Sequence, residues 1–324
     1  MDSRSRPLVS VLTPVYNTEK YLAECIQSIL SQSYTHWEYI IVNNCSTDGT
    51  LDIAKTFAEK DPRIRIHNNK EFVDIMTNHN LSLRQISAES KYCKIVAADD
   101  WIFPDCVTQM VDLAEANPTV GIVAAYSIRG EEIGNVGLSY PSTVVPGKDI
   151  CRRSLLGGPY VFGSPTGLLY RSDLVRSVEA FYPNLSPHAD TAACYAYLQR
   201  CDFGFVHQVL TYTRMNTEQT SERSRQLNYY IAEHLRYLVE YGPIYLDKVE
   251  LEKRIRKHMV NYYNFLGRNV FQGRNKEFWE FHKNQLAERG YPLNRLALAK
   301  VVSLKILDAL LNPKRTIQGL LERS

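Results

Sequence analysis

Residues 92–104, YCKIVAADDWIFP, decide the fold, because an apolar strand there runs directly into two adjacent acids, Asp99 and Asp100. At the edge of an open α/β sheet, the residues that end a strand face the crevice in which ligands bind. Divalent cations such as Mg²⁺ bind one or two carboxylates and complete their coordination with water and substrate phosphates. The acids therefore predict a cation site for a phosphate-bearing ligand. In the alternative interpretation, they open a loop and cap a helix that starts near Pro104.

Strands and amphipathic helices alternate on both sides of this stretch. Residues 8–13 (LVSVLT) predict a first buried strand, and the apolar spacing that follows predicts a helix capped by Thr18. Further strands are expected at 39–42, 64–67, 92–98 and 120–126, with helices at 51–58, 73–86 and 104–116. This order predicts an α/β fold with a mostly parallel sheet, right-handed crossovers and flanking helices.

The pattern changes twice toward the C-terminus. Glycines and prolines predict loops over 127–158, and a strand and a helix are expected at 167–170 and 191–199. Beyond about residue 217 the sequence becomes helical and basic. We therefore expect an α/β domain over 1–216 and a helical region over 217–324.

Charge is distributed unevenly along the 324 residues. The net charge is +3, but residues 1–250 carry 23 basic and 29 acidic side chains, whereas residues 251–324 carry 15 and 6. A basic region of this kind can bind anionic lipid, an acidic partner or another subunit. In the alternative interpretation, it is a helical face exposed to solvent. No nucleic-acid-binding motif accompanies it, so we expect no nucleic-acid partner.

The seven cysteines are scattered and show no CxxC or His/Cys ligand spacing, which predicts reduced thiols. The N-terminal residues lead into a strand without an apolar signal segment, and no apolar run approaches the roughly 20 residues of a membrane span. These features predict a cytoplasmic protein, with a peripheral position at the inner face of a membrane as an open alternative.

The C-terminal region contains an apolar stripe with basic neighbours. The stripe consists of Val301, Leu304, Leu307 and Leu311, and the neighbours are Arg295, Lys300, Lys305, Lys314 and Arg315. This pattern predicts either an interfacial helix beneath an anionic membrane or a helix that docks on the rest of the chain or on a second subunit of a homo-oligomer.

Two common nucleotide-binding signatures are missing from the sequence. No GxGxxG follows the first strand and no GxxxxGK[ST] occurs, which argues against a dinucleotide oxidoreductase and a P-loop enzyme. The kind of nucleotide site that remains is a diphosphate site built from acidic side chains and a metal ion.

Four segments together resemble the family 2 glycosyltransferases of the GT-A fold: VSVLTPVYN at 9–17, YLAECIQSILSQSY at 21–34, EYIIVNNCSTDGT at 38–50 and KIVAADD at 94–100. The resemblance implies a GT-A catalytic domain over 1–216. Its nucleotide-sugar half would cover about 7–126 and its acceptor half about 127–216, with a helical C-terminal appendage over 217–324. It further implies a nucleotide-sugar donor and Mg²⁺ or Mn²⁺ as cofactor.

By this resemblance, Pro14, Val15 and Tyr16 cradle the nucleotide base, and Asn44 accepts a hydrogen bond from the base N3–H. Family members usually carry aspartate at Asn44 and at the preceding Asn43, but an amide carbonyl retains the acceptor. In the alternative interpretation, both asparagines simply form the turn.

The resemblance also assigns the residues around the diphosphate. Asp99 would lie near the ribose, and Asp100 would ligate Mg²⁺ or Mn²⁺ between the donor phosphates. Asn80 would lie near the diphosphate, with His79 at a position where the family tends to show arginine. Arg214 would meet the diphosphate.

On the acceptor side, Asp190 resembles the family's general base, and it could equally be the N-cap of the helix over 191–199. Trp101 and the loop over 158–166 would line the acceptor pocket, together with His188, unless Trp101 packs in the core.

The function expected from these features is an inverting, metal-dependent glycosyltransferase. It would move a sugar from a UDP- or dTDP-activated donor to a hydroxyl of a glycan or lipid-linked acceptor in surface polysaccharide biosynthesis. A sugar nucleotidyltransferase should carry a glycine-rich, basic loop after the first strand, and TPVYN has none. A degenerate sugar-nucleotide-binding partner subunit is the other alternative, indicated by residues that replace the usual family ones: Asn43, Asn44, Ala189 and Asn216.

Overall fold

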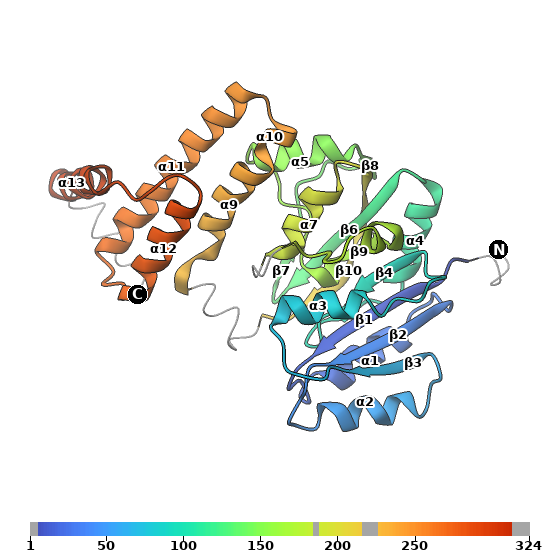
Figure 1. The fold of residues 1–324 in the computed structure, drawn as a ribbon. Helices are drawn as coiled ribbons and strands as arrows, with labels where there is room; N and C mark the ends of the chain where they lie inside the picture. The colour runs from blue at the N-terminus through green and yellow to red at the C-terminus, as the bar shows by residue number, and fades with distance from the viewer. Residues whose placement is uncertain (1–5, 184–187, 216–225, 313–324) are drawn as a thin grey trace. The chain divides into compact units, whose positions relative to one another are not determined.

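The computed structural model describes residues 6–183, 188–215 and 226–312. The chain separates into two compact units, Met1–Asn216 and Thr217–Ser324, which Figure 1 shows in blue to yellow and in orange to red. Asn216, at the end of the first unit, lies outside the described residues.

The first unit is built on one sheet with the strand order β3-β2-β1-β4-β9-β6-β10-β5. β3, β2, β1 and β4 are parallel to one another, and β10 is parallel to β6. β9 runs antiparallel between β4 and β6. The strands are β1 (Val9–Val15), β2 (Trp37–Asn43), β3 (Ile64–Asn68), β4 (Tyr92–Ile95), β5 (Trp101–Ile102), β6 (Val120–Arg129), β7 (Glu132–Gly134), β8 (Val144–Val145), β9 (Leu168–Arg171) and β10 (Asp202–Thr213). The predicted mostly parallel α/β sheet is confirmed, with β9 as the antiparallel insertion.

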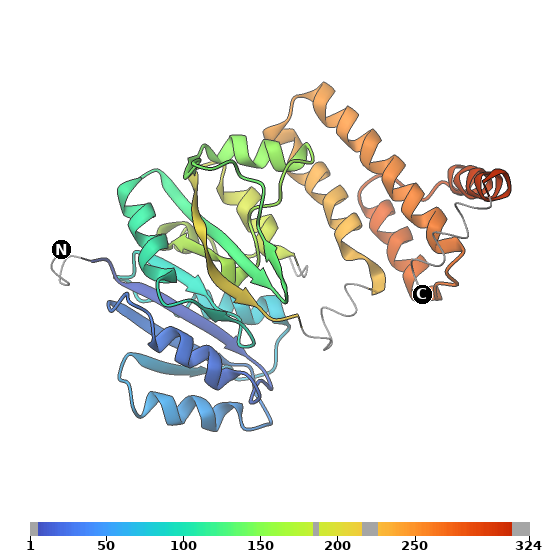
Figure 2. The same ribbon diagram turned by 180° about the vertical axis from the view of Figure 1, so that it is seen from behind.

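Helices cover both faces of this sheet. Figures 1 and 2 show α1, α2 and α4 on one face and α3 and α7 on the other. The helices of the unit are α1 (Leu22–Leu30), α2 (Thr50–Ala58), α3 (Ile75–Leu83), α4 (Cys106–Ala116), α5 (Gly147–Leu155), α6 (Ser172–Arg176) and α7 (Ala189–Tyr197). Apolar side chains of α1, α2 and α4 pack with alternate residues of β1 and β2 in one buried cluster, which the period-2 and period-3.6 patterns require.

Several details differ from the sequence prediction. Thr18 does not cap α1 with its side chain, and Tyr21 is the N-cap; the Thr18 carbonyl instead accepts hydrogen bonds from the Tyr21 and Leu22 amides. Residues 127–158 are not all loop, because they contain β7, β8 and α5. The acids after β4 do not cap α4, whose N-cap is Asp105.

The second unit is helical, as predicted. It contains α9 (Tyr229–Glu240), α10 (Gly242–Tyr245), α11 (Lys248–Val270), α12 (Lys276–Glu288) and α13 (Arg295–Leu311). Its core includes Leu235 of α9, Tyr262 and Leu266 of α11, and Phe278 and Leu286 of α12. Among the helices that the structure describes, none combines the length and apolar character that a membrane crossing requires.

Three histidines lie in or against this core. The Arg254 guanidinium donates to Nε2 of His234 (2.8 Å), Nε2 of His258 lies 2.9 Å from the Ile231 carbonyl, and the Tyr262 hydroxyl lies 2.7 Å from Nδ1 of His282. Burial lowers the pKa of His234 to about 3 and the pKa values of His258 and His282 to about 4. The three imidazoles are therefore neutral at physiological pH.

We predict that the helical unit is sensitive to acid. Since the folded pKa values lie below the ordinary histidine value of about 6.5, the unfolded chain binds protons that the folded unit does not, and stability present above pH 6.5 is lost as the pH falls. With three such groups, the free energy of unfolding should decrease by up to about 4 kcal/mol for each pH unit of acidification near pH 5. Hydrogen exchange of the α9, α11 and α12 amides in the full chain, measured at several pH values, reports this slope for the helical unit separately from the first unit.

His258→Gln should reduce that slope by about one third, and the control His36→Gln, at an exposed position of the first unit, should not change it. An unfolding free energy that stays constant from pH 7 to 5 would contradict the assignment.

Candidate active site

The carboxyl ends of the parallel strands meet at one edge of the sheet, because β1, β2, β4 and β10 run in the same direction. Tyr16 follows β1, Asn44 follows β2, and Arg214 follows β10. Asp99 and Asp100 follow β4 after a short loop. The topology thus gathers the predicted donor-site residues at the edge where open α/β sheets bind ligands.

The Asp100 side chain connects two distant parts of the chain. The residue is 4% exposed. Oδ2 accepts a hydrogen bond from Thr166 Oγ1 (2.6 Å), and Oδ1 accepts one from the Arg214 amide (3.0 Å). Thr166 Oγ1 also accepts a bond from the Ala97 amide (3.0 Å). Asp100 therefore joins the loop after β4, the 3₁₀ turn Pro165–Gly167 and the residue after β10.

A buried lysine supports this arrangement. Lys94 of β4 is fully buried, and its Nζ donates to the carbonyls of Thr166 (2.5 Å) and Leu168 (3.2 Å). Burial lowers the pKa of Lys94. The ammonium ties the turn that carries Thr166 to the strand that leads to Asp100. Sequence reasoning missed this residue, although a lysine inside an apolar strand run is itself an unusual signal.

The electrostatics of Asp100 fit a cation. Burial, and then the charge of Asp99, raise the pKa of Asp100 to about 7. Each carboxylate oxygen can accept a further contact beyond the hydrogen bonds described. Among the described residues, no three His, Cys, Asp or Glu side chains form a metal-binding group. A cation held by Asp100 beside Asp99 would complete its coordination with donor phosphates and water, as Mg²⁺ commonly does.

Arg214 lies against both acids. Its Nε donates to the Asp99 carbonyl (3.1 Å), and its Nη2 pairs with Oε2 of Glu24 (2.6 Å). The guanidinium carbon lies 4.7 Å from the ring centre of Tyr21 and 5.2 Å from that of Trp101. These contacts fix the guanidinium against the main chain of Asp99 and the carboxylate of Glu24.

The Trp101 ring is packed on one side and partly accessible on the other. It stacks on Tyr212 at 3.7 Å and 7°, so one face is packed. The residue is partly exposed and lines a shallow hollow of about 380 Å³ together with Glu24, Ser28 and Phe103. The hollow leaves part of the indole accessible to a ligand.

The Asn44 side chain holds the main chain before α3. Its Oδ1 accepts from the amide of Val73 and from Nδ2 of Asn69 (both 3.0 Å), and its Nδ2 donates to the Val73 carbonyl (2.8 Å). Asn43 Oδ1 accepts from the Ser46 amide (3.1 Å). Both asparagines therefore shape the turns around them, and both lone pairs of Asn44 Oδ1 are in use.

Two aromatic rings lie open near this turn. Tyr16 is 44% exposed and Phe72 is 59% exposed, and their ring centres are 4.7 Å apart. Together they offer apolar surface on which a planar base can stack. Phe72 was missed by sequence reasoning; an isolated phenylalanine among the polar residues between a strand and a helix is the signal that could have found it.

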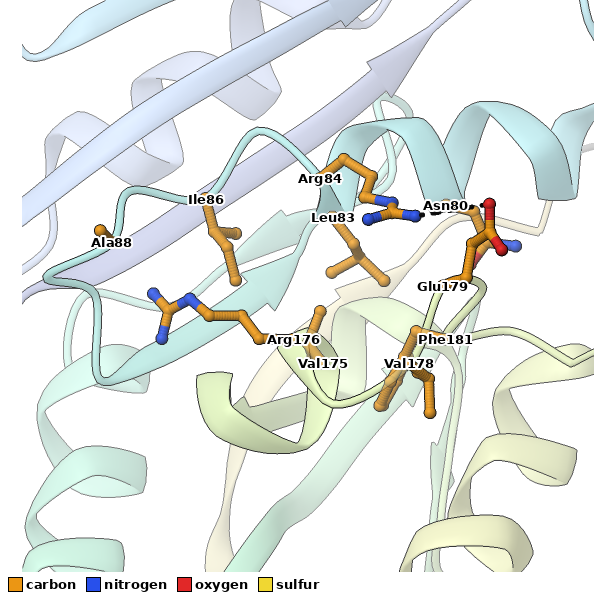
Figure 3. A pocket seen from close by; sticks show the side chains of 10 residues that line it. All are labelled: Asn80, Leu83, Arg84, Ile86, Ala88, Val175, Arg176, Val178, Glu179 and Phe181. Carbon is orange, nitrogen blue, oxygen red and sulfur yellow. Dashed lines mark ion pairs between the residues drawn. The ribbon is translucent and has the colours of Figure 1, made fainter.

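The Asn80 side chain makes hydrogen bonds with a different segment, the main chain at Tyr182. Its Nδ2 donates to the Tyr182 carbonyl (3.1 Å), and its Oδ1 accepts from the Tyr182 amide (2.9 Å). Figure 3 shows Asn80 at the edge of a cavity of about 290 Å³ between the end of α3 and the segment around Phe181, with the Arg84–Glu179 ion pair at its mouth. Neither Asp99 nor Asp100 lines this cavity. Burial lowers the pKa of the neighbouring His79.

Asp190 is a second buried carboxylate. It is the second residue of α7, whose N-cap position is His188, so the predicted N-cap role of Asp190 is wrong. Asp190 is 8% exposed, and its Oδ1 accepts from the Thr191 amide (2.8 Å). Burial raises its pKa to about 7. Direct contacts thus join Asp99, Asp100, Trp101 and Arg214, whereas those of Asn44, Asn80 and Asp190 run to other segments.

A comparison with family models places residues 10–178 in the family described as "Glycosyl transferase family 2". The matched residues cover more than half of the chain, and they include all of β1 except Val9, the two acids and the Thr166 turn.

Individual relatives match parts of the chain. TuaG of Bacillus subtilis (strain 168), provisionally named a teichuronic acid biosynthesis glycosyltransferase, is 32% identical over 127 residues, which span 39% of this chain and 50% of that protein. An uncharacterized glycosyltransferase of Haemophilus influenzae (strain ATCC 51907 / DSM 11121 / KW20 / Rd) is 28% identical over 224 residues, 66% of this chain and 68% of that protein.

Solved structures share the fold. Staphylococcus aureus TarS 1–349 in complex with UDP-GlcNAc has a TM-score of 0.66 at 17% identity, and the match covers 87% of this chain and 80% of that one. The mannosyltransferase PcManGT from Pyrobaculum calidifontis, in complex with GDP-Man and Mn²⁺, has a TM-score of 0.55 at 18% identity, with coverage of 97% and 84%. The sheet described above is therefore the predicted GT-A fold.

We predict that Thr166→Val destabilises the first unit. The change leaves Asp100 Oδ2 and the Ala97 amide without their hydroxyl partner, which should cost about 2–5 kcal/mol. Thr166→Ser keeps the hydroxyl and should cost about 1 kcal/mol for the lost methyl group. Urea unfolding of both variants at neutral pH measures the difference, and equal free energies for Val and Ser would show that the hydroxyl contributes nothing.

Proposed function

Because the chain belongs to glycosyl transferase family 2, we propose that it is an inverting, metal-dependent glycosyltransferase that acts on a nucleoside-diphosphate sugar. The observation that carries this proposal is the arrangement of residues around Asp100. A buried carboxylate with a raised pKa, an adjacent acid and a fixed arginine converge at the ligand-binding edge of the sheet. Such a site suits a diphosphate that gains negative charge during the reaction.

The donor would lie along the carboxyl ends of the parallel strands. Tyr16 and Phe72 would stack on the base, and Pro14 and the buried Val15 would position Tyr16 at the end of β1. Asn44 would hold the loop beneath the base. Asp99 would face the ribose. The UDP-GlcNAc in TarS supports a UDP- or dTDP-sugar as donor.

Asp100 would hold a divalent cation, Mg²⁺ or Mn²⁺, and the Mn²⁺ in the PcManGT complex supports this assignment. When bound, such a cation neutralises charge on the phosphate oxygens as the sugar leaves. Arg214 would donate hydrogen bonds to the same diphosphate, since Glu24 and the Asp99 carbonyl already orient it.

Asp190 would act as the general base. The acceptor hydroxyl oxygen would form a bond to the anomeric carbon while the bond from that carbon to the phosphate oxygen breaks, and the hydroxyl proton would pass to the Asp190 carboxylate. A pKa of about 7 suits a group that must be ionised to accept this proton near neutral pH. His188, Trp101 and the loop over 158–166 would contact the acceptor.

We further propose that the acceptor is a glycan or a lipid-linked saccharide in surface polysaccharide biosynthesis, a role that the name of TuaG supports. A cytoplasmic location is consistent with the seven cysteines, all of which are free thiols. Nucleic acid has no part in this proposal.

We predict that Asp100→Asn and Asp190→Asn each lower transfer by about 100-fold or more, because one weakens the cation site and the other removes the base. The assay is release of nucleoside diphosphate from a panel of nucleotide sugars with Mn²⁺. Asp105→Asn, at the exposed N-cap of α4 where the side chain makes no capping bond, is the matched control and should be fully active. Full activity of Asp190→Asn would remove that residue from the mechanism, and a wild-type chain that binds donor without turnover would support the binding-subunit alternative.

We also predict an acid limb in the pH profile. Since Asp190 must be deprotonated and its pKa is raised to about 7, the transfer rate with saturating donor should fall about tenfold per pH unit below that value. A rate that is constant from pH 5 to 8 would argue against Asp190 as the base.

A further inference from the structure

Helix α13 exposes most of its apolar side chains. None of its 17 residues is buried. Five leucines are between 51% and 83% exposed: Leu296, Leu304, Leu307, Leu310 and Leu311. Positions 307 and 311 lie 11 and 15 residues after position 296, which places all three within about 60° on one face of the helix. Contiguous apolar surface of this kind marks an interaction site in soluble proteins.

One side of α13 is fixed against α11. A Cβ atom added at Gly267 of α11 would lie 2.7 Å from Cγ1 of Val301 and 3.5 Å from Cε of Lys305, so α13 lies directly against the α11 backbone. The Asn294 amide donates to the Tyr263 hydroxyl (2.8 Å), and the Asn294 side chain caps the helix. Figures 1 and 2 show α13 beyond α11, on the side away from α9. The helix is thus held in place with a leucine-rich face turned away from its support.

The charge of α13 and of the region around it is mostly positive, since residues 251–324 carry 15 basic and 6 acidic side chains. At 100° per residue, Lys300 lies within the leucine face, whereas Arg295 and Lys305 lie on the other side of the helix, where Lys305 contacts α11. Asp308 is the acidic residue of α13. The same face of a second copy would bring like charges together, whereas the phosphates of anionic lipids would be attracted.

We propose that α13 is an interfacial helix that docks the chain on an anionic lipid bilayer. The leucines would enter the boundary between headgroups and acyl chains, and the lysine and arginine side chains would contact lipid phosphates. This docking extends the proposed function, because it would bring the catalytic unit to a surface that carries a lipid-linked acceptor. It requires neither donor nor acceptor, so it can fail or succeed independently of the transfer reaction.

The test is flotation of the full chain with vesicles of phosphatidylcholine, with and without phosphatidylglycerol. We expect binding to the anionic vesicles that weakens with salt, and at least about tenfold less binding to phosphatidylcholine alone. The combined variant Leu296→Gln, Leu307→Gln and Leu311→Gln should lose at least about tenfold in binding to the anionic vesicles. Val249→Gln with Ile133→Gln is the matched control, because these side chains are 74% and 59% exposed outside α13; it should bind like the wild type.

Three outcomes would overturn the proposal. The first is a wild-type chain that does not bind anionic vesicles, or binds them as well as the triple variant does. The second is a wild-type dimer in light scattering that the triple variant loses, without vesicle binding, which would assign the face to a second copy. The third is vesicle binding that appears only after deletion of residues 313–324, which would show that the C-terminal segment covers the face. Donor turnover of the triple variant, measured without vesicles, reports separately on the proposed function.

Discussion

A buried carboxylate must have hydrogen-bond partners, and this constraint shapes the first unit around Asp100. The Thr166 hydroxyl and the Arg214 amide supply these partners from two distant parts of the chain. Lys94 in turn fixes the turn that carries Thr166. The end of β10, and with it the Arg214 guanidinium, therefore has its position set by the same carboxylate. The pKa of about 7 shows that hydrogen bonds compensate burial only in part, which leaves Asp100 suited to a positive partner.

Two asparagines of this unit each connect distant segments through a pair of hydrogen bonds to one main-chain residue. The Asn44 amide makes two hydrogen bonds with the main chain of Val73, just before α3. Within α3, the Asn80 amide makes the same pair of bonds with Tyr182, eight residues before Asp190. A neutral amide can donate and accept at once, whereas an aspartate at either position could only accept. The asparagines thus link the end of β2 to the start of α3, and α3 to the segment around Tyr182.

The sequence predicts the elements whose signals are local. The apolar runs of β1, β2 and β4 and the periodic helices between them are confirmed within a few residues. β10 was missed because it pairs with β6, about 80 residues earlier, and its register shifts between Val206 and Thr211 break the alternation of side chains. α5 was missed because Gly147 suggests a loop. In the structure, a Cβ there would lie 2.0 Å from the Leu198 carbonyl oxygen, so the glycine serves a close tertiary approach that no local pattern reveals.

The candidate site also combines features with a local sequence signal and features that depend on long-range contacts. Acids after an apolar strand are visible in the sequence, but the partners of Asp100 are not, since Thr166 and Arg214 are 66 and 114 residues away. The pairing of Tyr16 with Phe72 likewise depends on the parallel order of β1, β2 and β3.

Each unit contains one feature for which we propose an external partner. In the first unit, Asp99 and Asp100 place two negative charges together. In the helical unit, the aromatic core is buried, but five leucines of α13 are exposed. Natural sequences deviate from local consistency mainly at functional sites. A surface-bound enzyme also meets a lipid-linked acceptor in two dimensions, so attachment raises the effective acceptor concentration without any new contact in the active site.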